Sequence, residues 1–167
     1  MDFQDSATVT TALAGYYFQK TVQNLISGAN PATTAAPGDR LRYRVRLFNV
    51  DQMINDITIT DPLDLNSFDL TTFTMTTPPP AGVTYSFNPL NGLLTVSGDT
   101  VPLNVAVGGE LVIEFEITLK PTLTNGTAVD NQATLSALGL TAYSDDPYIN
   151  GIAPPGYPAD PTRVLIC

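Results

Sequence analysis

Hydrophobic and polar residues alternate in short runs along most of the chain, and Gly, Pro and Asn separate these runs. Alternation with a period of two residues is typical of β-strands that bury one face. Turn sequences such as Asn91-Gly92 and Gly108-Gly109 lie between the runs, and we find no amphipathic helix of useful length. We therefore expect an all-β sandwich or barrel, with strands at about residues 15–23, 40–47, 55–61, 70–76, 83–87, 93–97, 111–119 and 128–136.

The clearest strand runs from Arg40 to Leu47, where apolar residues and arginines alternate without exception. We expect the apolar set to be buried and the arginines to lie near water against acidic neighbours. The alternative is a binding stripe for an anionic partner. Glu114 and Glu116 alternate with apolar residues in the same way, so we interpret them as an exposed strand face rather than a catalytic carboxylate pair. The two sets of the first strand are Leu41, Tyr43, Val45 and Leu47, and Arg40, Arg42, Arg44 and Arg46.

Composition narrows the possible functions. The chain has 167 residues, enough for one ordinary domain, and its 23 threonines against three glutamates and two lysines favour strands over helices. The absence of histidine excludes Ser-His-Asp and Cys-His catalysis and histidine metal sites. A net charge of −9 argues against nucleic-acid binding. No apolar run approaches the ~20 residues of a membrane span. We expect a monomer, and Cys167, the single cysteine, cannot form an internal disulfide.

The domain organisation follows from the same patterns. Residues 1–14 are polar and Thr-rich and form either a leader or an extra strand. Residues 15–138 are expected to form the β-sandwich. Residues 139–167 change in composition and read as an irregular tail, which ends either in a final strand at 162–166 or in a linker to a next domain.

Three predicted strands each direct one polar residue toward the core. Lys20 shares its face with Tyr16 and Phe18, Asp61 with Ile57 and Ile59, and Asn131 with Val129 and Ala133. Buried polar groups of this kind are costly unless they are paired, so their joint occurrence indicates a site. A register error of one residue in any strand would turn its polar residue outward.

A known chemistry connects an amine, a carboxyl and a carboxamide. A lysine kept neutral in an apolar pocket is a nucleophile, and a buried protonated carboxyl can polarise a carboxamide carbonyl. Attack by Lys20 on Asn131, with Asp61 as proton donor, would release ammonia and form an intramolecular isopeptide bond between the first and last strands of the domain. The alternative is a buried Lys20–Asp61 ion pair with Asn131 as a hydrogen-bonding third partner.

Four sequence motifs in the same order resemble one protein family. They are Lys20-Thr21-Val22, Pro37-Gly38-Asp39 with the strand that follows it, Ile57 to Leu63, and Asn131 to Leu135. The match, over about residues 15–136, is similar to the immunoglobulin-like conserved repeat domains of large bacterial surface proteins. The resemblance implies an antiparallel immunoglobulin-like β-sandwich and the crosslinking roles just described for Lys20, Asn131 and Asp61.

Together these observations favour a structural stalk module of a bacterial cell-surface protein or adhesin, located outside the cell and flanked by neighbouring repeat domains. Such a module is not an enzyme, because self-crosslinking occurs once. The alternative is an adhesin tip that recognises a glycan or host protein through the segments at 78–85 and 143–157. We expect no cofactor. Asp145-Asp146 is a weak candidate for Ca²⁺ binding, and Asn125-Gly126-Thr127 has the form of a glycosylation sequon but reads as a turn.

Overall fold

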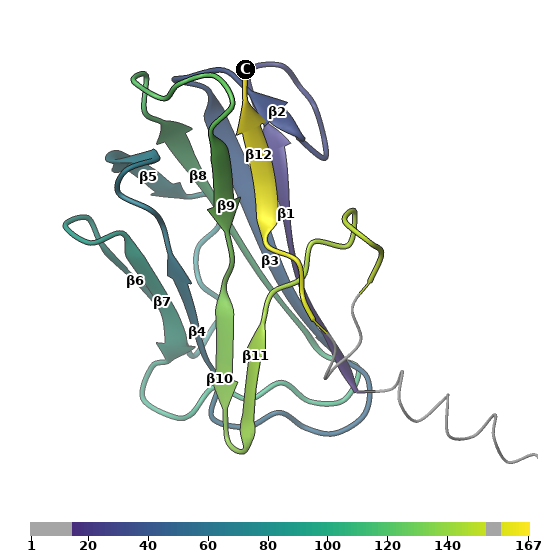
Figure 1. Ribbon diagram of the computed structural model, residues 1–167. Coiled ribbons are helices and arrows are strands. Elements are labelled where there is room, and N and C mark those ends of the chain that lie inside the picture. Colours follow the sequence, from purple (N-terminus) through teal and green to yellow (C-terminus); the bar gives the residue numbers. More distant parts are fainter. Residues whose placement is uncertain (1–14, 153–157) are drawn as a thin grey trace, which may run out of the picture.

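The alternating runs fold into two facing β-layers in the computed structural model, which describes residues 15–152 and 158–167 (Figure 1). The described residues form twelve strands and no helix. In chain order the strands are β1 (Tyr16–Asn24), β2 (Thr34–Ala35), β3 (Arg40–Asn49), β4 (Thr58–Pro62), β5 (Phe68–Met75), β6 (Val83–Asn88), β7 (Leu93–Gly98), β8 (Glu110–Leu119), β9 (Ala128–Asn131), β10 (Thr134–Ala137), β11 (Leu140–Tyr143) and β12 (Thr162–Ile166).

The first layer is a four-stranded antiparallel sheet in the order β1-β3-β8-β5. The second layer combines the sheet β11-β10-β4-β7-β6 with the smaller sheet β2-β12-β9. Only residues 132–133 separate β9 from β10, so one stretch of chain connects the two sheets of this layer (Figure 1). The β2–β12 pairing is parallel, whereas the other strand pairs are antiparallel.

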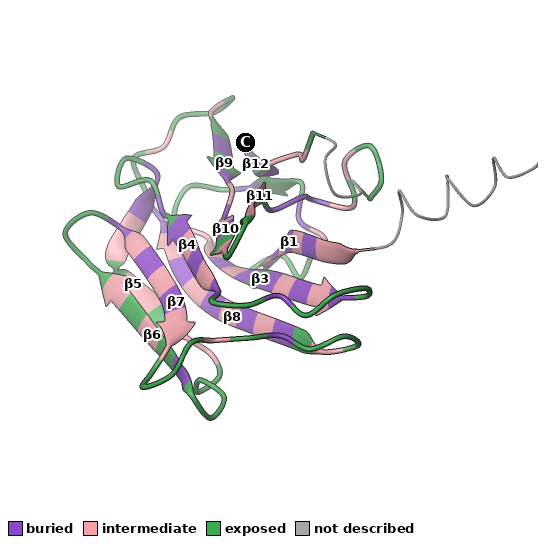
Figure 2. Ribbon diagram, turned by 90° about the horizontal axis from the view of Figure 1, so that it is seen from below, coloured by how far each residue is buried: buried purple, intermediate pink, exposed green. Residues whose placement is uncertain are grey.

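The core lies between the two layers and is lined by the inner face of each strand. Along β3 and β8, buried residues alternate with partly exposed ones, and Figure 2 shows this banding on both strands. Leu41, Tyr43, Val45 and Leu47 are buried, whereas the arginines between them are half-buried or exposed. The predicted register of this strand is therefore confirmed, because a one-residue slip would have exchanged the two sets.

The structure corrects four details of the predicted strands. The run at 128–136 is divided into β9 and β10, and β4 begins at Thr58 rather than at residue 55. β2 and β11 carry too few residues to give a periodic signal, so the sequence did not predict them. Asn131 lies on β9, and three strands follow it, so the expectation that it lies on the last strand is wrong. The predicted leader or extra strand at 1–14 lies outside the described residues.

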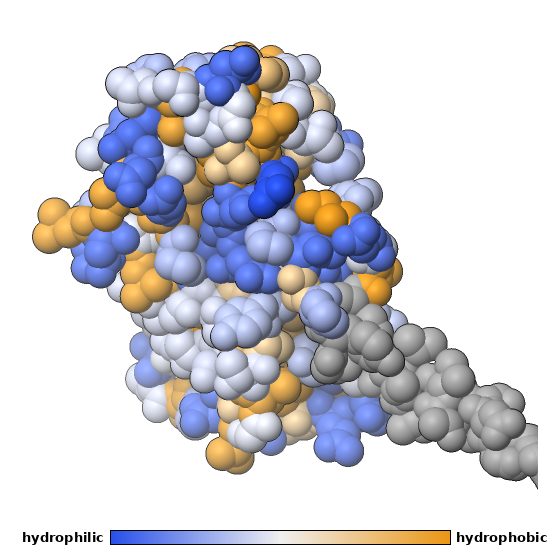
Figure 3. Space-filling model, viewed as in Figure 1, coloured by the Kyte–Doolittle hydropathy of each residue, from blue (hydrophilic) through white to orange (hydrophobic). Residues whose placement is uncertain are grey.

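The surface is mixed in polarity. Hydrophilic residues form a band across the face seen in Figure 3, and hydrophobic residues occur at separate places on it. The described part of the chain includes no helix that is long and apolar enough to cross a membrane.

Candidate functional site

Lys20 extends from β1 into the core, where its side chain has no exposed surface. Its Nζ donates a hydrogen bond to Oδ2 of Asp61, which lies on β4 in the opposite layer. Asp61 is also buried, with 1% of its surface exposed. The parity argument therefore placed both residues on the correct face, and the structure brings them together.

Two aromatic rings border the amine. The Nζ atom lies 5.0 Å from the ring centre of Tyr43 and 5.6 Å from that of Phe115. These rings come from β3 and β8, and their centres are 5.6 Å apart in a stacked arrangement. Sequence reasoning assigned Tyr43 only to the buried face of its strand, although that face is also the one that Lys20 occupies on the neighbouring strand.

Burial alters the acidity of the lysine. It lowers the pKa of Lys20 to about 8 from an ordinary value of 10.5, although the charge of Asp61 and the hydrogen bond to it act in the opposite direction. Removing the amine from water disfavours its charged form, and this loss exceeds what one carboxylate restores. Neutral amine is thus more accessible at Lys20 than at an exposed lysine, which is a requirement for a nucleophile.

Asn131 is the third predicted residue, and 3% of its surface is exposed. β4 and β10 run antiparallel with Thr60 opposite Thr134, so Asp61 and Asn131 both lie beyond this pair in the same direction. Both residues are buried in the same layer. Oδ1 and Nδ2 of Asn131 have no hydrogen-bond partner among the described residues.

Four buried polar atoms in the described part of the chain lack a hydrogen-bond partner, and three of them belong to the predicted site. These three are Oδ1 of Asp61 and both amide atoms of Asn131, and the fourth is the hydroxyl of Tyr43. Native proteins satisfy most buried polar groups, so such a concentration requires an explanation. The free carbonyl oxygen of this carboxamide can accept a hydrogen bond from a proton donor. A nucleophile can then attack the carbonyl carbon, and the amide nitrogen can leave.

Two neighbours fix the position of β1. Oγ1 of Thr162 on β12 donates a 2.8 Å hydrogen bond to the carbonyl of Lys20, and the Lys20 backbone N–H donates to the carbonyl of Asp145 at 2.9 Å. The Asp145 backbone N–H donates in turn to Phe18. The segment around Asp145 and Thr162 of β12 therefore extend the hydrogen bonding along the edge of β1 and satisfy both the N–H and the carbonyl of Lys20.

Asp145 and Asp146, the weak Ca²⁺ candidates, are both buried. Oδ1 of Asp145 accepts a hydrogen bond from the backbone of Asp160 at 3.0 Å, and Oδ1 of Asp146 accepts one from Tyr148 at 3.0 Å. Burial, together with the charges of Asp145 and Asp160, raises the pKa of Asp146. Within the described ranges, no three His, Cys, Asp or Glu residues are grouped so that they could hold a metal ion.

The arginine stripe meets the acidic neighbours that the sequence predicted. Nη2 of Arg42 lies 2.7 Å from Oε2 of Glu116, and Nε of Arg40 lies 3.1 Å from Oε1 of the same carboxylate. Arg46 pairs with Glu110. The hydrogen bonds from Arg42 and Arg40 lower the pKa of Glu116, against a smaller opposing effect of burial. These pairs occupy the outer face of the sheet and explain the stripe without an external partner.

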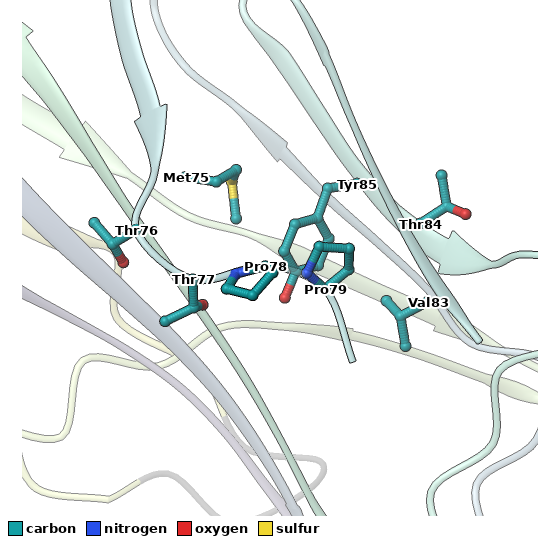
Figure 4. A pocket seen from close by; sticks show the side chains of 8 residues that line it. All are labelled: Met75, Thr76, Thr77, Pro78, Pro79, Val83, Thr84 and Tyr85. Atoms are coloured by element: carbon teal, nitrogen blue, oxygen red, sulfur yellow. The ribbon is translucent and has the colours of Figure 1, made fainter. Parts of the chain in front are cut away.

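A cavity of about 500 Å³ lies between edge strands β5 and β6 and the loop that connects them. Figure 4 shows the side chains that line it, which include two consecutive prolines and one tyrosine. This cavity contains the first of the two segments that the sequence suggested for a ligand-binding tip. Its lining residues are Met75, Thr76, Thr77, Pro78, Pro79, Val83, Thr84 and Tyr85.

Comparison with solved structures identifies the class of fold. An uncharacterised protein from Nocardia farcinica with an immunoglobulin-like fold matches at a TM-score of 0.55 and 16% identity, over 89% of this chain and 98% of that one. The C-terminal domain of the Streptococcus pyogenes antigen I/II-family protein AspA matches at 0.52 and 14%, over 89% of this chain and 46% of that one. A Corynebacterium diphtheriae protein described as membrane-anchored matches at 0.54 and 12%, over 100% of this chain and 37% of that one.

These likenesses confirm the predicted immunoglobulin-like fold, and with it the resemblance noted in the sequence at the level of the fold. The chain spans less than half the length of the streptococcal and corynebacterial structures. Searches with the sequence against protein families and against curated proteins found no match. Function must therefore be argued from the site itself.

Proposed function

We propose that this chain is a structural module of a bacterial cell-surface protein, stabilised by an intramolecular isopeptide bond between Lys20 and Asn131. The observation that carries the proposal is the buried Lys20–Asp61 pair in a core that also holds an unpartnered carboxamide. The streptococcal and corynebacterial fold neighbours support the cellular setting, because they are an antigen I/II-family domain and a protein described as membrane-anchored.

The reaction begins with a proton transfer. The ammonium of Lys20 gives one proton to Asp61 along their hydrogen bond, which leaves a neutral amine and a protonated carboxyl. The carboxyl then donates a hydrogen bond to Oδ1 of Asn131 and draws electron density from Cγ. The amine lone pair attacks Cγ, and the negative charge that develops on Oδ1 is stabilised by this donor.

The remaining steps restore the catalyst. The Nζ–Cγ bond forms, one proton moves from Nζ to Nδ2 through Asp61, and the Cγ–Nδ2 bond breaks to release ammonia. No atom is oxidised or reduced, and Asp61 ends with the proton count with which it began once the ammonia takes up the remaining proton. The surrounding aromatic and aliphatic side chains exclude water, so hydrolysis of the carboxamide does not compete.

The bond would serve a mechanical and thermodynamic purpose. It closes a loop of roughly 100 residues, which on the disulfide analogy stabilises the fold by about 4–5 kcal/mol through the unfolded chain. It also joins the two layers of the sandwich covalently, because Lys20 and Asn131 lie on opposite layers. The part of the module between Lys20 and Asn131 would resist extension, and the module turns over no substrate.

An accurate intact mass tests the proposal. The wild-type protein should be lighter than its sequence mass by one ammonia, whereas Lys20→Ala, Asp61→Ala and Asn131→Ala should each show the full mass of their own sequence. Lys120→Ala is the matched control, because Lys120 is the other lysine of the chain, and this variant should still lose ammonia. An unmodified wild-type mass from folded protein would contradict the proposal and leave a non-covalent Lys20–Asp61 pair.

A second candidate function, ligand binding by an adhesin tip, is favoured by the cavity between β5 and β6. Its prolines and Tyr85 offer rigid apolar surface, and its threonines offer hydroxyl groups. A glycan array probed with the wild type and with Tyr85→Ala tests this function. Binding that disappears in Tyr85→Ala would support it, and an array without any bound glycan would count against glycan recognition at this cavity.

A further inference from the structure

Tyr43 has a feature that its packing role does not require. Its side chain is fully buried, yet its hydroxyl has no hydrogen-bond partner among the described residues. A buried hydroxyl without a partner destabilises the fold, and phenylalanine would fill nearly the same volume at this position without that cost. The neighbouring β8 strand uses Phe115 beside it for that purpose.

The aromatic ring that carries this hydroxyl lies beside the amine of the proposed crosslink. The ring of Tyr43 borders the Lys20 amine at 5.0 Å. The negative charges of Asp61 and Asp130 both act on the phenol and, after burial, raise its pKa further. Asp130 directly precedes Asn131 on β9, so the charges that act on the phenol include one on the strand that carries the carboxamide.

We infer that the Tyr43 hydroxyl is a second hydrogen-bond donor to the side-chain carbonyl of Asn131 during isopeptide formation. This inference rests on the proposed function. The carbonyl oxygen of a carboxamide has two lone pairs, and Asp61 supplies a donor for one of them. The Tyr43 hydroxyl is an unpartnered buried donor on a ring that borders the amine, and Oδ1 of Asn131 is a buried acceptor without a donor. Two donors on one oxygen form an oxyanion hole, which stabilises the charge that develops when the amine attacks.

The inference makes a kinetic prediction for Tyr43→Phe, which removes only the hydroxyl. The chains are made in a short pulse of cell-free synthesis, and their intact mass is then measured at successive times. The change in mass gives the rate at which ammonia is lost. We expect the Tyr43→Phe protein to lose ammonia roughly 100–1,000-fold more slowly than the wild type, since one oxyanion donor is absent. Tyr17→Phe, on the outer face of β1, is the matched control and should react at the wild-type rate.

The melting temperature distinguishes a role of the Tyr43 hydroxyl in the reaction from a role in packing. In the Lys20→Met background no bond can form, and there Tyr43→Phe should melt at least as high as its parent, because it removes an unpaired hydroxyl. A slower reaction without a lower melting temperature would therefore be an effect on the reaction itself. An unchanged rate in Tyr43→Phe would overturn the inference, and so would a faster rate, which would mean that the hydroxyl holds Asp61 in its charged form.

The mass measurements distinguish a missing isopeptide bond from a bond that forms without help from Tyr43. A wild type that never loses ammonia contradicts the isopeptide bond and this inference with it, whereas a wild type that reacts at the same rate as Tyr43→Phe contradicts this inference alone. If Tyr43→Phe does not fold, 3-fluorotyrosine incorporated into the wild-type chain provides the second measurement. It keeps the hydroxyl but makes it a stronger donor, so the loss of ammonia should become faster, and an unchanged rate would overturn the inference.

Discussion

The two faces of the β1-β3-β8 sheet hold opposite charges under contrasting conditions. On the inner face, the Lys20 amine meets Asp61 of the facing layer, and neither side chain has more than 1% of its surface exposed. On the outer face, Arg42 meets Glu116 at 2.7 Å, with 36% and 17% of their side-chain surfaces exposed. Strand parity alone separates the two environments, since inward and outward residues alternate along the same strands.

The contrast shows that environment, rather than the pairing of charges, determines the chemistry. Water around the outer pairs keeps both partners charged and screens their attraction, so exposed pairs contribute only about 0.2–1 kcal/mol each. The interior instead makes charge expensive, which lowers the pKa of Lys20 and makes neutral amine available. The outer face is therefore suited to solubility and strand pairing, whereas the inner face is suited to a reaction.

The largest effect is expected for Asp61→Ala. This variant loses the proposed crosslink and leaves the Lys20 amine buried without its partner. The two losses together should lower the free energy of unfolding by more than about 5 kcal/mol, as measured by urea denaturation. The double variant Lys20→Met/Asp61→Leu also lacks the crosslink but carries no buried charge, so it should unfold at a higher urea concentration than Asp61→Ala. Equal midpoints for the two would refute the claim that the unpaired charge is costly.

A smaller effect is expected from pH in Asn131→Ala, which retains the Lys20 amine but cannot form the bond. Between about pH 8 and pH 10 the folded chain releases the proton of Lys20 while the unfolded chain still holds it, so the stability should rise with pH. The shift corresponds to about 2–3 kcal/mol over this range. Above pH 10 the trend should reverse, because burial raises the pKa of Tyr43 and only the unfolded chain then loses that proton.

Urea denaturation of Asn131→Ala at a series of pH values measures this dependence. The wild type is the control, since the nitrogen of an isopeptide bond does not titrate in this range and the rise between pH 8 and pH 10 should be absent. The same rise in both proteins would indicate that the wild type keeps a free amine.

The smallest effect is expected on the outer face. Arg42→Ala should lower the free energy of unfolding by about 1 kcal/mol or less, and the difference should shrink in high salt as the ion pair is screened. Arg44→Ala is the matched control, because Arg44 is exposed on the same strand and makes no ion pair within the described part of the chain. A loss of several kcal/mol in Arg42→Ala would mean that the outer pairs are as important as the inner one.

Much of this architecture was predictable because antiparallel strands alternate strictly between two environments. The parity of β3 located the arginine stripe and the buried Tyr43, and the parity of β1 and β4 directed Lys20 and Asp61 inward. No long-range information was needed for these predictions. The face that a residue occupies is a local property of its strand.

Features that depend on how strands meet could not be predicted in this way. β2 pairs through two residues only, and its partner β12 lies far along the chain. The break between β9 and β10 follows from pairing with two different neighbours, β12 and β4. The unpartnered hydroxyl of Tyr43 could be found only from the structure. The alternating pattern treats a tyrosine as an apolar residue and carries no information about the hydrogen-bond partners of its oxygen.

The position of β12 has a consequence for the protein under load. A bond between Lys20 and Asn131 would leave β10, β11 and β12 outside the covalent loop, so a pull on the end of β12 would first strip these strands from the sandwich. Residues 132–167 measure roughly 120 Å when fully extended, so at most this length could be drawn out before the crosslink carried the load. Under load, the strands after Asn131 would thus unfold first, and the crosslink would prevent further unfolding. Single-molecule pulling on the wild type should show extension that halts near this length, whereas Lys20→Ala should continue to unravel.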